Sequence, residues 1–72
     1  MKNQYYIVIA GLRNANFTNI PVSTPEEASK DAFGIYNPTF RCIPIGNKKP
    51  QIDPLTYIVK NGKSLLSKIK NS

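Results

Sequence analysis

Apolar residues occupy both faces of the stretch Tyr5–Leu12, YYIVIAGL, if it is extended. Its β-branched and aromatic side chains favour a strand over a helix. Because the apolar run is continuous and does not alternate with polar residues, it predicts a central strand covered on both sides, or one whose outer face meets a partner.

A second strand is predicted at Phe17–Val22, FTNIPV, after a polar turn at 13–16. We expect it to pair antiparallel to the first strand. Pro21 cannot donate a hydrogen bond to a neighbouring strand. The second strand therefore lies at an edge of the sheet, or ends at Pro21.

The segment Ser23–Phe33 carries strong signals for the start and end of a helix. Thr24 suits the N-cap and Pro25 suits the first helical position. Glu27, three residues after the cap, completes the pattern of a capping box. Gly34 can provide a left-handed C-terminal cap. We therefore predict a short helix that ends before Gly34.

A third strand is predicted at Thr39–Ile45, TFRCIPI. Pro44 again implies an edge position or a strand end. Alternation along the strand divides its side chains between the two faces. One face receives Arg41, Ile43 and Ile45, and the other receives Phe40 and Cys42. The following loop, GNKKPQ at 46–51, is basic and has the composition of an exposed turn.

A longer amphipathic helix is predicted over Asp53–Lys70. Asp53 can cap it and Pro54 suits its first position. Its apolar residues recur at the helical spacing of i, i+3, i+4 and i+7, and they are Leu55, Ile58, Val59, Gly62, Leu65, Leu66 and Ile69. The alternative rests on Asn61–Gly62, a strong hairpin signal. It gives a strand at 55–60 followed by a short helix at 63–70.

The predicted order of elements is therefore β-β-α-β-α. We expect an α+β fold in a single domain over residues 1–72, with an antiparallel sheet of about three strands and helices on one or both of its faces. One helix is short, and the C-terminal helix is longer and amphipathic.

Positive charge is concentrated in the last third of the chain. The net charge is +6, and residues 47–72 hold six basic residues against one acidic residue, whereas residues 1–46 hold four against three. This asymmetry indicates a polyanion or an acidic protein surface as partner, although lysines also serve solubility alone. The candidate polyanion-binding residues are Lys48, Lys49, Lys60, Lys63, Lys68 and Lys70.

Side chains for catalysis or metal binding are scarce. The chain has no histidine and one cysteine, Cys42, which excludes an intramolecular disulfide, histidine-based nucleophilic pairs and ordinary zinc sites. Three of the four carboxylates, Glu26, Glu27 and Asp31, belong to the first predicted helix, where capping and the helix dipole explain them. We expect no enzymatic activity and no cofactor. Cys42 is expected to be a buried apolar residue, the alternative being a thiol whose pKa Arg41 lowers.

The leading hypothesis is a small, non-catalytic basic module that docks on a polyanion, with RNA or a ribonucleoprotein favoured. The second is a protein-binding module, either an inhibitor encoded by a phage or mobile element or a small subunit of a larger assembly. The apolar opening run is too short to cross a membrane and lacks the pattern of a signal peptide. We therefore expect a cytoplasmic location and no membrane partner.

Overall fold

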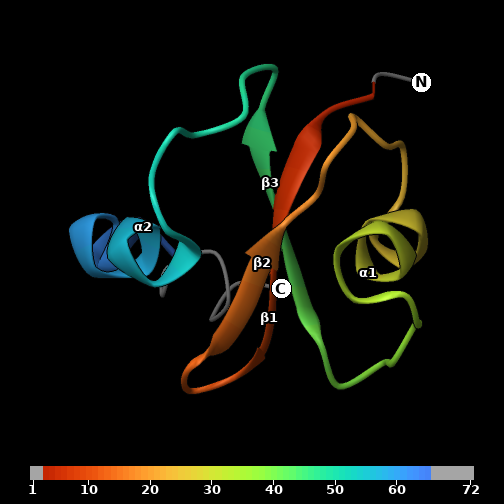
Figure 1. Cartoon of the computed structure of the whole chain (residues 1–72), viewed down its shortest axis with the longest axis horizontal. Helices are drawn as coiled ribbons and strands as arrows, with labels where there is room; N and C mark the ends of the chain where they lie inside the picture. Colours follow the sequence, from red (N-terminus) through yellow and green to blue (C-terminus); the bar gives the residue numbers. More distant parts are fainter. Residues whose placement is uncertain (1–2, 66–72) are drawn as a thin grey trace.

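The computed structural model describes residues 3–65 and contains a three-stranded antiparallel sheet in the order β2-β1-β3. The two helices lie on opposite sides of this sheet (Figure 1). The prediction of an α+β fold with a small antiparallel sheet is confirmed. No helix in the described part of the chain is long and apolar enough to span a membrane. The elements are β1 (Tyr5–Gly11), β2 (Asn14–Phe17), α1 (Pro25–Phe33), β3 (Arg41–Gly46) and α2 (Pro54–Lys60).

Strand β1 is the central strand, and both of its faces are buried. Tyr6 and Val8 point to the α1 side, where they pack with Ala28. Ile7 points to the opposite side and packs with Leu65, beyond the end of α2. The continuous apolar run of the sequence therefore reflects two cores, one on each face, as the prediction of a strand covered on both sides requires.

Strand β2 starts three residues earlier than its predicted first residue, Phe17. The chain turns at Leu12 and Arg13, because Gly11 pairs with Asn14 and the ladder continues to the pair Ile7–Phe17. The predicted turn at 13–16 and the predicted strand at Phe17–Val22 are both wrong in their bounds. Asparagine usually favours turns, but here NANF alternates between exposed asparagines and buried apolar residues, which is the pattern of a strand with one buried face.

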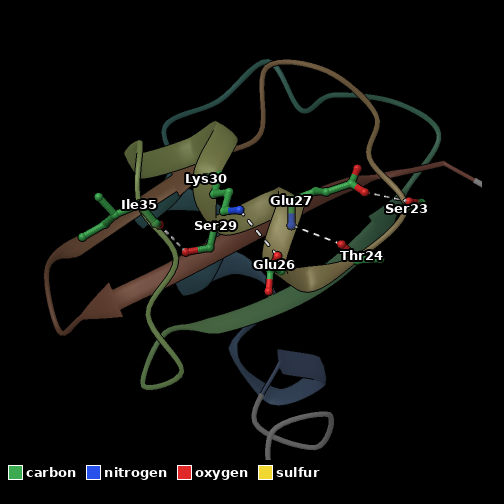
Figure 2. A network of polar contacts seen from close by, with 7 residues as sticks. All are labelled: Ser23, Thr24, Glu26, Glu27, Ser29, Lys30 and Ile35. Atoms are coloured by element: carbon green, nitrogen blue, oxygen red, sulfur yellow. Dashed lines mark hydrogen bonds and ion pairs between the residues drawn. The ribbon is translucent and has the colours of Figure 1, made fainter.

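Helix α1 begins and ends where the sequence predicts (Figure 2). The amide of Glu27 donates to Thr24 Oγ1 at 3.1 Å. The Glu27 carboxylate accepts from Ser23 Oγ at 3.2 Å. The second bond of this capping box therefore involves Ser23, the residue before the N-cap Thr24. Gly34 ends the helix with a φ of 81°, in the left-handed region that glycine adopts without steric cost.

The predicted long helix over Asp53–Lys70 is not supported. The helix α2 ends at Lys60, Asn61 forms its C-cap, and residues 62–65, the last that the structure describes, are again helical. The alternative strand at 55–60 is wrong, since this segment is helical. Leu66, Ile69 and the rest of the predicted helix after Leu65 lie outside the described residues.

The apolar stripe predicted for this helix is also partly wrong. Val59 has 83% of its surface exposed, whereas Tyr57, which is not on the predicted stripe, packs with Phe17 of β2. The two rings lie 5.5 Å apart between centroids and perpendicular to each other. Ile58 and Leu65 complete this contact with the sheet.

Strand β3 forms one edge of the sheet, and Pro44 suits that position. The amide and carbonyl of Tyr6 both bond to Thr18, on the β2 side of β1. Pro44 pairs with Tyr6 on the other side, so this pair is not a hydrogen-bonded one and the Pro44 nitrogen faces away from β1. An edge strand that cannot donate there is protected against pairing with another chain.

Candidate polyanion-binding surface

The sheet separates the charges of the two helical layers. Helix α1 carries Glu26, Glu27 and Asp31 against one lysine, Lys30, which forms an ion pair with Glu26 at 3.5 Å. The segment 47–65, which contains α2, carries four lysines against one aspartate, Asp53. Because α1 and α2 cover opposite faces of the sheet (Figure 1), an anion approaching the α2 side meets the more positive layer.

Lys60 and Lys63 line the same shallow hollow of about 480 Å³ at the C-terminal end of α2. Both residues are exposed. Asn61 and Ser64 add polar groups to the hollow, and the Asn61 amide is held in place by donating to the carbonyl of Tyr57 at 3.0 Å. The hollow is lined by the consecutive residues 59–64, so two of the six predicted site lysines lie together there because they are three positions apart in the chain. Two lysines that line one hollow are chemically suited to bind an anionic oxygen cluster such as a phosphate.

The acidic residue of this layer does not compete for these lysines. Asp53 is the N-cap of α2, at the opposite end of the helix from Lys60. Its carboxylate accepts from the amide of Leu55 at 2.9 Å and from that of Thr56 at 3.4 Å. Lys60 is itself placed favourably for the fold, because a cation in the last turn interacts well with the helix dipole.

The remaining predicted lysines lie elsewhere or beyond the described part. Lys48 and Lys49 are exposed in the loop after β3 and do not line the hollow at Lys60 and Lys63. The Lys49 ammonium donates to Asn19 Oδ1 at 3.3 Å, on the loop between β2 and α1. The backbone amide of Asn19 in turn donates to the Asp31 carboxylate of α1. Lys49 is therefore linked through Asn19 to the acidic helix. Lys68 and Lys70 lie outside the described residues.

The chemistry available in the described residues is limited. Cys42 is partly buried and packs with the α1-side core, and burial raises the pKa of its thiol above the ordinary value of 9.0. Arg41 pairs with Ile9, which packs in the α2-side core, so its side chain lies on the other face of the sheet and does not lower that pKa. Residues 3–65 contain no group of three histidine, cysteine or carboxylate side chains that could hold a metal ion.

A second hollow was not predicted from the sequence. It has a volume of about 490 Å³, lies at the hairpin end of the sheet, and is mainly apolar. The residues that line it are Ile9, Ala10, Gly11, Leu12, Thr39, Arg41 and Ile58. The sequence did not indicate it, because Leu12 was predicted to end the first strand, whereas the structure places Leu12 and Arg13 in a two-residue turn.

Comparison with known proteins gives no relative for this chain. No protein-family model, no curated protein and no solved structure matches it. Its function is therefore inferred from its own residues.

Proposed function

We propose that this protein is a non-catalytic module that binds a polyanion, with RNA as the favoured partner, through the surface around Lys60 and Lys63. The observation that carries the proposal is the shared hollow of these two lysines, in a helical layer whose aspartate is occupied as an N-cap. Lys48, exposed in the preceding loop, can add a further contact.

The chemistry of lysine favours recognition of the phosphate backbone over reading of bases. A lysine ammonium acts as a compact point charge, whereas reading of guanine usually requires the planar fork of arginine. Both arginines of the chain, Arg13 and Arg41, lie outside the hollow that Lys60 and Lys63 line. RNA is the first polyanion to test because duplex RNA is recognised mostly by its shape and its backbone, which lysines can contact. Little sequence preference is expected.

The test is a titration of the full chain against labelled single- and double-stranded RNA and DNA at two or more salt concentrations. The variant Lys60→Gln/Lys63→Gln should bind more weakly. It should also lower the slope of log K against log salt by about 0.7 to 0.9 for each phosphate that is no longer neutralised. A matched control, Arg13→Gln/Lys30→Gln, removes the same charge from positions outside the hollow and should leave more of the affinity intact. Removing Lys30 breaks only an exposed pair, which contributes little stability.

Two results would contradict this proposal. The first is no binding of any of the four nucleic acids at low salt. The second is an equal loss of affinity in the two double variants, which would mean that net charge alone, and not the surface around Lys60 and Lys63, governs binding.

The second candidate function is a protein-binding module. A different observation favours it, the apolar hollow at the hairpin end of the sheet, and a partner bound there would leave the lysine surface free.

A further inference from the structure

The apolar hollow lies where the α2-side core opens at the end of the sheet. Ile9 of β1 and Ile58 of α2 belong to that core and also line the hollow. Leu12 stands at its rim in the hairpin turn and is fully exposed, with a relative exposure of 101%. An exposed leucine beside an open apolar hollow gives a contiguous apolar surface, which can receive an apolar side chain of a partner, as an isolated exposed leucine cannot.

The residues of the hairpin turn are not those that a tight turn favours. Among residues 3–65, no residue other than glycine has a positive φ, so the turn at Leu12 and Arg13 is neither of the mirror-image types that suit two-residue hairpins. Asparagine and glycine there would have given the favoured turn. The turn instead presents a large apolar side chain and a guanidinium group, and arginine is enriched at protein interfaces.

Arg41 supplies a charge at the same hollow. It is exposed, and within residues 3–65 it forms no ion pair. Three of the four carboxylates of the chain belong to α1, on the other face of the sheet, and the fourth, Asp53, caps α2. Within residues 3–65 no carboxylate pairs with Arg41, so its guanidinium group is available to a carboxylate of another molecule. Arginine is the residue best suited to such a pair, because its fork can donate two parallel hydrogen bonds to a carboxylate.

We propose that this hollow binds a segment of a partner protein in which a large apolar side chain stands next to an aspartate or glutamate. The apolar side chain enters the hollow against Ile9, Leu12 and Ile58, and the neighbouring carboxylate pairs with Arg41. The mainly apolar lining favours a peptide over a nucleic acid, whose backbone would bury charge there without a second cation in the hollow. This interaction is independent of the surface around Lys60 and Lys63.

The experiment is a selection of displayed random dodecapeptides on the full chain, with excess heparin present to occupy the lysine surface. Enriched peptides should carry a leucine, isoleucine, methionine or aromatic residue within two positions of an aspartate or glutamate. Synthetic copies should bind at least about tenfold more weakly to Arg41→Gln and to Leu12→Ser. Both substitutions are at exposed positions, and circular dichroism should show an unchanged fold.

Matched controls separate this site from the other surface. Ile20→Ser removes an apolar residue of similar size that is 56% exposed in the loop after β2, and Lys60→Gln/Lys63→Gln removes the lysine pair. Neither should change peptide affinity. In a nuclear magnetic resonance titration, amide shifts should be largest at Ile9, Gly11 and Ile58.

The inference is overturned if no peptide is enriched, if the enriched peptides lack an acidic residue, or if they bind Arg41→Gln and Leu12→Ser as tightly as the unchanged protein. Peptides whose binding is weakened only by Lys60→Gln/Lys63→Gln would also overturn it, because they would be bound as polyanions. Each of these outcomes leaves the nucleic-acid titration to be judged by itself.

Discussion

Tyr6 and Thr18 exchange two hydrogen bonds just beyond the end of β2. The Thr18 amide donates to the carbonyl of Tyr6 at 3.0 Å, and the Tyr6 amide donates to Thr18 Oγ1 at 3.1 Å. The threonine hydroxyl thus accepts the bond that a strand carbonyl would otherwise accept, and the pairing of β1 continues for one residue after Phe17. Both residues are buried, and Thr18 has no exposed surface, so water cannot replace either bond.

The first prediction concerns this hydroxyl. Thr18→Val keeps the size and branching of the side chain but leaves the Tyr6 amide buried without an acceptor, and it should lower the free energy of unfolding by about 1–3 kcal/mol. Thr18→Ser keeps the acceptor and loses only a methyl group, at a cost of about 1 kcal/mol. Urea denaturation of the two variants compares them directly. A serine variant less stable than the valine variant would show that packing, and not the hydrogen bond, matters at this position.

The second prediction concerns the side chains that hold the C-terminal part to the sheet. Leu65 is 4% exposed and packs with Ile7 and Ile43, so Leu65→Ala should cost about 2–5 kcal/mol. Val59→Ala is the matched control on the same predicted stripe. Val59 is largely exposed, so its truncation should change stability by no more than about 0.5 kcal/mol. Thermal unfolding of both variants tests this difference. A similar loss of stability in both would mean that Val59 is buried with Leu65 on one apolar face, as the sequence predicted.

The elements with local signals could be predicted from the sequence. Helix α1 is specified by its own cap, first-turn proline and terminal glycine, and the central position of β1 follows from its continuous apolar run. The bounds of β2 could not be predicted, because the strand identity of Asn14–Phe17 depends on pairing with β1 rather than on residue preference. The buried face of α2 was misplaced for a similar reason. The helix is too short for its apolar period to define a face, and its orientation depends on the contact between Tyr57 and Phe17.

The candidate surfaces were predictable to different degrees. Charge counting identified the lysine-rich segment, but not that Lys60 and Lys63 share one hollow while Lys49 bonds to Asn19. Those facts depend on where the chain ends α2 and on how two distant loops meet. The hollow at Arg41 is built from three separate stretches of the chain, 9–12, 39–41 and residue 58, and no local pattern brings such stretches together.

The third prediction concerns the thiol of Cys42. Burial raises its pKa above 9.0, so at neutral pH the folded protein holds less thiolate than an ordinary cysteine does. The reaction with a disulfide reagent should be slow in the native protein, fast in denaturant, and should still accelerate as the pH rises past 9.0. The folded state favours the protonated thiol. The Cys42 thiol should therefore lower the free energy of unfolding as the pH rises above the pKa that this thiol has in the unfolded chain. Labelling of the native protein within seconds at neutral pH would contradict this account.

The last prediction separates the two adjacent lysines of the loop after β3. Lys49 donates to Asn19, whose amide bonds to the Asp31 carboxylate, so binding a phosphate would require Lys49 to leave that position and the negative charge near it. Lys48 is exposed and has no such contact among residues 3–65. Lys48→Gln should therefore weaken binding to RNA more than Lys49→Gln does, although both remove one charge from the same loop. In Lys48→Gln the slope of log K against log salt should fall by about 0.7 to 0.9 if Lys48 contacts one phosphate. The change in this slope should be smaller in Lys49→Gln. The titration that tests Lys60 and Lys63 measures both variants. A larger effect of Lys49→Gln would show that its bond to Asn19 breaks when RNA binds.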